Sequence, residues 1–201
     1  MAYRFIVLEG IDGCGKATQC DALARALGKL RQPVAVHKYP TDGAQRVHEH
    51  LQGKKTSSQD ELFAAFVDDI ASSQARLCED LKKGWVLADR YAVSTAAYQG
   101  AGGKLDARMA GIDALRLIKP DLVIWLDLPV EEAMRRKAAQ KKPDAHESDR
   151  AFLEEVRKNY AELGRRSFLS ARWQKIDASQ TPERITREIR LAIEGKTGKT
   201  Y

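Results

Sequence analysis

The sequence predicts an α/β fold: a three-layer α/β/α sandwich with a five-stranded parallel sheet. Five short apolar segments have the composition of strands, and a stretch with helical periodicity separates each from the next. Runs such as Val123-Ile124-Trp125-Leu126 are apolar without alternation, which is typical of strands covered by helices on both faces. With 201 residues the chain has the length of one such domain, so we expect residues 1–201 to form a single domain.

The predicted strands cover, in chain order, Phe5–Leu8, Val34–Lys38, Trp85–Ala88, Leu122–Asp127 and Trp173–Asp177. Apolar residues at helical spacing predict a crossover helix at 18–30, one long helix at 61–82 that ends before Gly84, and a last helix that begins near Pro182. Parallel strands end at one edge of their sheet, and α/β proteins bind ligands there. The functional site is therefore expected at the carboxyl ends of these strands.

A glycine-rich loop lies between the first predicted strand and the first predicted helix. It comprises Gly10, Ile11, Asp12, Gly13, Cys14, Gly15, Lys16, Ala17 and Thr18. Glycines permit positive φ and a close approach of the backbone, so that N–H groups and the helix N-terminus converge on phosphate oxygens, while Lys16 reaches the outer phosphates. The spacing G-x-x-x-x-G-K in this context predicts a nucleoside triphosphate site. An ordinary glycine-rich turn is the alternative, and it would not need Lys16.

The loop departs from the usual pattern just after its lysine. That position is normally Ser or Thr, whose hydroxyl holds Mg²⁺, but this chain has Ala17, with Thr18 one residue late. We therefore expect Mg²⁺ to be held by phosphate oxygens and water, with little direct ligation by the protein. Cys14 adjoins a helix N-terminus and Lys16, which would favour its thiolate and make it a target of thiol reagents.

The composition favours a cytoplasmic protein that binds small anions. No apolar run approaches the roughly 18 residues of a membrane span, and the three cysteines form neither a disulfide framework nor a metal cluster. The net charge of +6 could serve a nucleic acid, but the densest basic stretch, Arg135-Arg136-Lys137 with Lys141 and Lys142, lacks interleaved aromatic residues. Small polyanions are therefore favoured as ligands, with no nucleic acid and no membrane as partner.

A second group of polar residues follows the third predicted strand. It reads Asp89-Arg90-Tyr91, then Ser94, then Ala97-Tyr98-Gln99-Gly100. A carboxylate in this place can organise water around Mg²⁺, and a guanidinium can grip a second phosphate bidentately. Taken alone, Asp89 and Arg90 would be interpreted as a structural ion pair. Beside a phosphate cradle they are interpreted as substrate ligands.

Residues 138–149 interrupt the apolar period between two helices with Lys, Gln, Pro, His and Asp. A solvated loop is the simpler interpretation. The segment follows a cationic helix face, however, and phosphoryl transfer requires the exclusion of water. We therefore predict a lid at 138–149 that carries Lys141 and Lys142.

Four stretches of this chain resemble the thymidylate kinases, a family in the nucleoside monophosphate kinase branch of the P-loop proteins. They are FIVLEGIDGCGK, KYPTDG at 38–43, DRYAVSTAAYQG at 89–100, and PDLVIWLDLPVEEAMRR followed by the charged lid. Their order and spacing hold over nearly the whole chain, and the third stretch is the most specific. The resemblance implies a P-loop NTPase fold and transfer of the γ-phosphoryl group of ATP to dTMP, giving dTDP and ADP, with Mg²⁺ and usually in a homodimer.

The resemblance also implies roles for single residues. Lys16 and the loop amides would hold the β- and γ-phosphates, Arg90 would clamp the acceptor phosphate, and Asp89 would order water around the metal. The acceptor site would further include Asp12, Tyr39, Pro40, Phe66, Ser94, Tyr98 and Gln99. The loop has no arginine, so the assisting cation would come from the lid side, where Arg136 is best aligned and Lys141 and Lys142 are further candidates. The predicted catalytic residues are Asp12, Lys16, Arg90 and Arg136.

One departure from the family concerns the nucleobase. Relatives place Arg four residues after a base-stacking Phe, whereas here Phe66 leads to Ile70 and Phe63 leads to Val67. Phe66 is expected either to stack on the base or to pack in the core. A kinase for another deoxynucleotide or a deoxynucleoside is therefore the alternative function. A nucleotide-binding regulatory module is the alternative from a different class.

Overall fold

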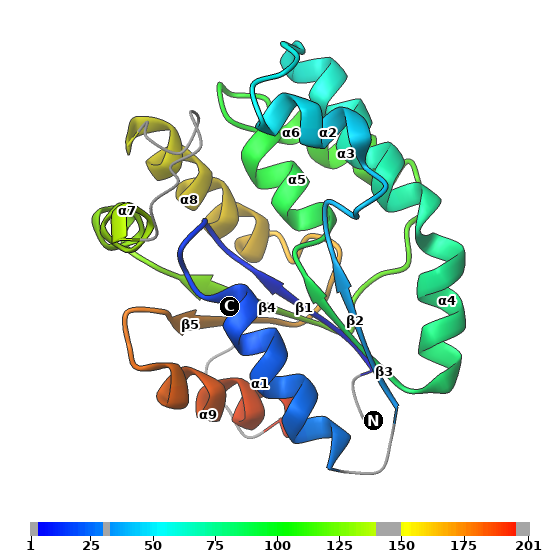
Figure 1. Cartoon of the computed structure of the whole chain (residues 1–201), viewed down its shortest axis with the longest axis vertical. Coiled ribbons are helices and arrows are strands. Elements are labelled where there is room, and N and C mark those ends of the chain that lie inside the picture. Colours follow the sequence, from blue (N-terminus) through cyan, green and yellow to red (C-terminus); the bar gives the residue numbers. More distant parts are fainter. Residues whose placement is uncertain (1–3, 30–32, 140–149, 196–201) are drawn as a thin grey trace.

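The computed structural model describes residues 4–29, 33–139 and 150–195, and their strands form a five-stranded parallel sheet (Figure 1). The strands are β1 (Phe5–Glu9), β2 (Val34–Lys38), β3 (Trp85–Asp89), β4 (Leu122–Asp127) and β5 (Trp173–Asp177). Their spatial order is β2-β3-β1-β4-β5, and every neighbouring pair is parallel. The predicted fold class is confirmed, and β1 and β3 each extend one residue beyond the predicted end.

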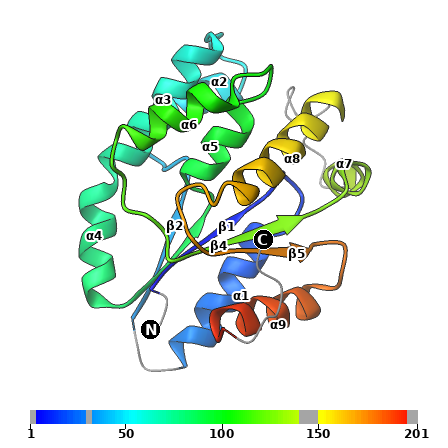
Figure 2. The ribbon, with the colours of Figure 1, turned by 180° about the vertical axis from the view of Figure 1, so that it is seen from behind.

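Helices cover both faces of the sheet, as the view from behind also shows (Figure 2). On one face lie α1 (Lys16–Gly28) and α9 (Pro182–Ile193), which pack on each other. The opposite face carries a group of helices around α5, which packs on α3, α6 and α8. The bounds of these helices and their neighbours are α2 (Gln45–Leu51), α3 (Gln59–Ser72), α4 (Gln74–Lys83), α5 (Ala92–Gln99), α6 (Leu105–Asp113), α7 (Val130–Ala139) and α8 (Arg150–Arg165).

The burial of each strand follows from its place in the sheet. Every residue of β1, β3 and β4 is buried, whereas the edge strands β2 and β5 keep exposed positions. The central strands are the segments whose apolar runs do not alternate, because both of their faces meet helices. These strands provide a rigid base for the loops at their carboxyl ends.

The predicted long helix at 61–82 is wrong in one respect, since two helices occupy this stretch. Ser73 ends α3 and also precedes α4. The Ser73 hydroxyl donates to the carbonyl of Ile70 (2.7 Å), and the Gln74 amide donates to the same oxygen (2.9 Å). These side chains take over a backbone acceptor that a continuous helix would use, which is the known way in which serine competes with helical hydrogen bonding.

The register of the sheet brings three predicted site segments together. Leu8 of β1 lies opposite Asp89 of β3, and the backbone N–H of Arg90 donates to the Leu8 carbonyl (3.0 Å). On the other side of β3, the N–H of Tyr39 donates to the carbonyl of Asp89 (3.1 Å). The glycine-rich loop, the turn at Arg90 and the segment after β2 therefore start side by side at one edge of the sheet.

The predicted lid lies almost wholly outside the described residues. Its first two positions, 138 and 139, belong to α7, and Lys141 and Lys142 fall in the stretch 140–149 that the structure does not describe. Within the described ranges, no helix combines the length and the apolar character needed to cross a membrane.

Candidate active site

The glycine-rich loop between β1 and α1 has the shape of a phosphate cradle. Gly10, Gly13 and Gly15 have φ values of 141°, 84° and 96°. A Cβ atom on Gly10 would lie 2.5 Å from the carbonyl oxygen of Leu126, so the loop packs on β4 too closely for any other residue. The Lys16 ammonium donates to the carbonyls of Gly10 (3.0 Å) and Ile11 (3.1 Å). The lysine is thus held on the loop itself, above the N-terminus of α1, whose first N–H groups lack helical partners.

The structure argues against the reactivity expected of Cys14. Its side chain is fully buried in the loop, and burial raises the pKa of the thiol even though Lys16 and Arg90 act in the opposite direction. The sequence places Cys14 beside positive charge correctly, since the Lys16 ammonium lies 3.7 Å from its sulfur. Loss of water around the thiolate outweighs that attraction. We therefore expect a packed and unreactive thiol.

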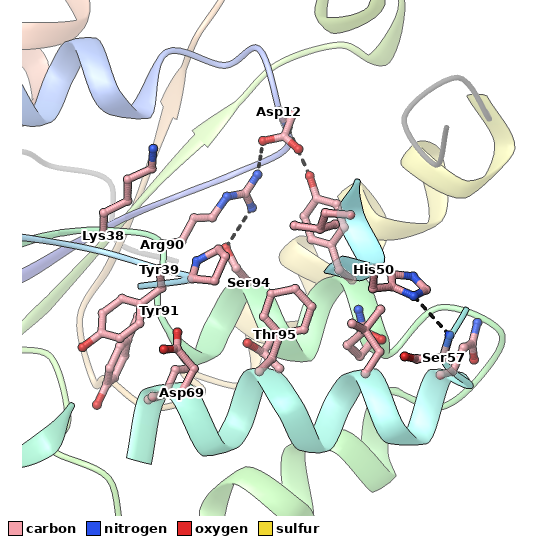
Figure 3. A pocket seen from close by; sticks show the side chains of 18 of the residues that line it. Asp12, Lys38, Tyr39, His50, Ser57, Asp69, Arg90, Tyr91, Ser94 and Thr95 are labelled. Atoms are coloured by element: carbon pink, nitrogen blue, oxygen red, sulfur yellow. Dashed lines mark hydrogen bonds and ion pairs between the residues drawn. The ribbon is translucent and has the colours of Figure 1, made fainter. Parts of the chain in front are cut away.

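The carboxylate of Asp12, in the glycine-rich loop, lies near cations from three separate segments of the chain. Asp12 forms an ion pair with Arg90 (Figure 3). Its carboxylate also lies 3.7 Å from the ammonium of Lys16 and 3.7 Å from that of Lys137. Burial alone would raise the pKa of Asp12, but the three cations outweigh it and hold this pKa well below its usual range. We call these four residues the Asp12 cluster. Three positive charges face one negative charge, so the cluster has an excess of positive charge suited to phosphate.

Arg90 is held in one orientation by its surroundings. Its φ of 69° lies in the left-handed region, which a side chain other than glycine rarely adopts and which is typical of functional turns. The guanidinium donates to the hydroxyl of Ser94 (3.2 Å) and lies over the ring of Tyr98, 5.1 Å from its centroid. Arg90 pairs with Asp12 and not with its sequence neighbour Asp89, so the structural ion pair considered from the sequence is absent among the described residues.

A buried acid lies beneath the cluster. Glu9, the last residue of β1, has no exposed surface, and burial raises its pKa to about 7. The hydroxyl of Ser94 donates to Glu9 and also lies 2.9 Å from the hydroxyl of Tyr160 on α8. The second carboxylate oxygen of Glu9 has no hydrogen-bond partner in the described part of the chain. Sequence reasoning missed Glu9, because it ends an apolar strand that predicts only packing.

A pocket with a volume of about 420 Å³ opens beside the Asp12 cluster, within the roughly 300–1,000 Å³ typical of small-molecule sites. It lies between the carboxyl edge of the sheet and α3 (Figure 3). All the residues predicted for the acceptor site line it: Asp12, Tyr39, Pro40, Phe66, Arg90, Ser94, Tyr98 and Gln99. The structure thus brings together residues from four separate sequence segments, while their roles stay predictions.

The side of the pocket formed by α3 and the segment before it combines apolar side chains with the polar residues His50, Ser57, Gln59 and Asp69. Phe66 and Ile70 line it together with Leu62 and Leu51, whereas Phe63 lies outside the pocket beneath Arg108, 4.5 Å from the guanidinium. Of the two Phe-led pairs considered from the sequence, Phe66 and Ile70 are therefore the pair whose members both line the pocket. Ile70 offers no hydrogen bond to a base, and sequence reasoning also missed Thr95, whose hydroxyl group is carried by α5 on the opposite wall.

Apart from the residues of the glycine-rich loop, two described residues with a predicted role, Arg136 and Asp89, lie outside this pocket. Arg136 on α7 donates to the carbonyls of Ala178 (3.1 Å) and Gly13 (3.4 Å) and to Glu132 (2.8 Å). The side chain from the same helix that reaches Asp12 is Lys137, which sequence reasoning did not single out. Asp89 is 8% exposed at the end of β3, next to the loop but not in the pocket lining.

Comparison with known proteins agrees with this geometry. The sequence model of the family described as thymidylate kinase matches residues 8–189. A thymidylate kinase of Synechococcus sp. is 35% identical over 208 residues, which cover 96% of both chains, and one of Alcanivorax borkumensis is 35% identical over 204 residues, with 96% of this chain and 97% of the relative covered. The resemblance found in the sequence is confirmed by these matches. The chain belongs to the thymidylate kinase family.

Proposed function

We propose that the protein is an enzyme that transfers the γ-phosphoryl group of ATP to the 5′-phosphate of dTMP, giving dTDP and ADP. Membership of the family implies the use of ATP. The observation that carries the proposal is the Asp12 cluster, because it joins the lysine of the phosphate cradle to Arg90 at the mouth of the pocket. A donor on the loop and an acceptor in the pocket would meet there with their phosphates facing each other.

Phosphoryl transfer needs placement and positive charge more than it needs covalent chemistry. Lys16 would exchange the carbonyls of Gly10 and Ile11 for the outer phosphates of ATP. Arg90 would exchange the Asp12 carboxylate for the acceptor phosphate, which its planar guanidinium can bind bidentately. Before the substrates bind, the Asp12 carboxylate thus occupies the place that the acceptor phosphate takes later. Once both substrates are bound, Asp12 lies beside both reacting phosphates.

The nucleoside of dTMP would occupy the rest of the pocket. Tyr39 and Pro40 would form one wall, and the Tyr39 hydroxyl is fixed by Ser73 at 2.7 Å. Ser94, Tyr98 and Gln99 would face the sugar and base from α5, and Tyr98 is positioned by the backbone N–H of Asp12, which donates to its hydroxyl (3.1 Å). Phe66 would stack on the thymine ring.

The residues near the loop fit Mg²⁺ held mainly by its substrates. Within the described ranges, no three His, Cys, Asp or Glu side chains form a group that could hold a metal ion. Asp89 supplies one buried carboxylate beside the loop, and Ala17 supplies no hydroxyl. Mg²⁺ commonly takes one or two carboxylates and keeps water and substrate phosphates as its other ligands. We propose that Asp89 contacts the ion through water, and the ion would neutralise charge on the transferred phosphates.

We assign Arg136 to the donor side of the active site. Its guanidinium lies between the carbonyl of Gly13 in the loop and that of Ala178 after β5. A nucleotide whose phosphates lie in the loop would extend beside it. We expect Arg136→Ala to raise the KM for ATP more than it lowers kcat, and a loss of turnover at unchanged KM would contradict this assignment.

We also propose that the enzyme is a cytoplasmic homodimer. Cys14, Cys20 and Cys78 are all free, which fits a reducing compartment. The dimer rests on the family resemblance. Light scattering coupled to size-exclusion chromatography should give twice the chain mass of 22.4 kDa, and a monomer mass at micromolar concentration would contradict the dimer.

A kinase for another pyrimidine deoxynucleotide is the second candidate, because Ile70 lines the base end of the pocket where relatives have Arg. A pocket with hydrogen-bond donors to the base discriminates sharply between bases, whereas a pocket with apolar walls discriminates weakly. Relaxed discrimination between dTMP, dUMP and dCMP would favour this candidate.

An assay that couples formation of ADP to a detectable product tests the proposal. ATP is supplied with dTMP, dUMP, dCMP, GMP or thymidine, and Lys16→Ala and Arg90→Ala serve as inactive controls. The proposal predicts the highest kcat/KM with dTMP and none above background with thymidine, which lacks the acceptor phosphate. Equal turnover without any acceptor would contradict it and indicate a nucleotide-hydrolysing regulatory module.

A further inference from the structure

Three consecutive cations on α7 point in different directions, because successive helical residues are rotated by about 100°. Arg135 is 74% exposed and pairs with Glu132 (2.7 Å). Arg136 is held between Gly13 and Ala178. Lys137 is 20% exposed, lines the pocket, and reaches the Asp12 carboxylate at 3.7 Å. Among these three cations, only Lys137 belongs to the Asp12 cluster.

The two oxygens of the Asp12 carboxylate face different cations. Arg90 and Lys16 lie against one oxygen, and Lys137 lies against the other. Arg90 and Lys16 already serve the acceptor and donor phosphates in the proposed function. Lys137 approaches the same carboxylate from α7, at its other oxygen. An anion that replaces the carboxylate at this point would therefore lie within reach of Lys137 as well as of the other two cations.

We propose that Lys137 is the catalytic cation that neutralises the phosphoryl group during its transfer. The assignment rests on the proposed function, and it takes the place that the sequence suggested for Arg136. In the reaction, an oxygen of the acceptor phosphate forms a bond to the γ-phosphorus, the bond from that phosphorus to the bridging oxygen breaks, and ADP leaves with the electron pair. Lys137 donates no proton to this step and supplies charge alone.

The chemistry of the side chain suits this role. A lysine ammonium is a compact charge on a flexible stem, so it can follow an oxygen that moves between two partners. Before substrates bind, Asp12 holds Lys137 near the position it needs, which reduces the cost of ordering the side chain. Charge stabilisation of this kind acts more strongly in the transition state than in the ground state, and it therefore changes kcat more than KM.

Two substitutions of Lys137 separate charge from packing. Lys137→Met keeps the apolar stem and removes the charge, whereas Lys137→Arg keeps the charge. Lys137→Met should lower kcat with dTMP and ATP about 100-fold, with both KM values within about threefold of the parent. The kcat of Lys137→Arg should be at least about tenfold higher than that of Lys137→Met. The control Arg135→Met removes a charge from the same helix outside the cluster and should leave kcat within about twofold.

The outcomes distinguish this assignment from the proposed function. If the parent enzyme forms no dTDP, the proposed function fails. If the parent is active and Lys137→Met keeps its kcat within threefold, or raises only the KM for ATP, the assignment of Lys137 fails alone. Thermal unfolding of each variant is recorded beside the kinetics. A loss of turnover in Lys137→Met that Lys137→Arg does not reverse, with an equal fall in melting temperature for both, would show a structural role and overturn the assignment.

Discussion

The two ends of the acceptor pocket are built on different principles. At the phosphate end, Asp12, Arg90 and Lys137 form a network of ion pairs that fixes each side chain through the others. On the α3 side, which we call the base end, Phe66 and Ile70 provide apolar contact, and Asp69 accepts hydrogen bonds from Thr41. On the proposed function, we expect the phosphate to supply most of the binding energy and the base to be selected mainly by shape.

This contrast also has a physical consequence for specificity. A charged group that loses its partner in a desolvated site costs far more than an apolar contact that is merely imperfect. An acceptor without a phosphate should therefore be rejected strongly. An acceptor with a different pyrimidine should be rejected weakly.

The largest effect is expected at the phosphate end, from Arg90→Ala. The variant leaves Asp12 as the partner of Lys16 and Lys137 and removes the bidentate grip on the acceptor, so kcat/KM for dTMP should fall about 1,000-fold or more. Steady-state kinetics at varied dTMP measures it, and Arg90→Lys should recover only a small part because a lysine cannot bind bidentately. If Arg90→Ala lowers kcat/KM for dTMP less than tenfold, the phosphate end does not contribute more than the base end, and the comparison fails.

The next effect concerns Glu9, beneath the phosphate end. Its pKa is raised from 4.5 to about 7 by burial, so the folded state favours the protonated acid. The stability that this group contributes is present below pH 4.5 and is lost as the pH rises through about 7. The shift corresponds to a change on the order of 3 kcal/mol.

Glu9→Gln removes this titration. Relative to the parent, the variant should gain about 2–3 kcal/mol in its free energy of unfolding between pH 5 and pH 8, as measured by urea denaturation. Glu79→Gln, on the exposed surface of α4, is the control and should change by less than about 0.5 kcal/mol. If the free energy of unfolding changes with pH in the same way in the parent and in Glu9→Gln, then Glu9 is ionised at both pH 5 and pH 8.

A smaller effect is expected at the base end, from Phe66→Leu. Loss of stacking on the base should raise the KM for dTMP about tenfold and change kcat little, since aromatic pairs contribute about 0.5–1.5 kcal/mol beyond area burial. Phe63→Leu is the matched control, because Phe63 lies outside the pocket beneath Arg108. If Phe66→Leu lowers the melting temperature and leaves KM unchanged, Phe66 packs in the core and does not stack.

The smallest effect is expected at the start of α3, the helix that carries the base end. Ser58 accepts a hydrogen bond from the N–H of Glu61 (3.2 Å), and the Glu61 carboxylate accepts one from the N–H of Ser58 (2.9 Å), which forms a capping box. Ser58→Ala should lower the free energy of unfolding by about 1 kcal/mol and leave kcat unchanged. A clear fall in kcat would show that the base end is less independent of catalysis than proposed.

The sequence predicts contiguous motifs better than contacts that depend on helix rotation and packing, for a physical reason. The cradle and the segment from Asp89 to Gln99 are contiguous motifs, and the parallel sheet necessarily places them side by side. Which of two adjacent cations on α7 reaches Asp12 depends on the rotation of that helix, and a run of charges does not reveal it. The break at Ser73 likewise depends on side-chain hydrogen bonds that compete with the helix. The burial of Cys14 arises from the packing of the loop on β4.

The most direct test of the central claim is calorimetric binding of dTMP and thymidine to the protein without ATP. The two ligands share base and sugar and differ only in the phosphate. If the Asp12 cluster grips the acceptor phosphate, dTMP should bind about 100-fold tighter than thymidine, and Arg90→Ala should remove most of this difference. Equal affinities for dTMP and thymidine in the parent protein would contradict the account.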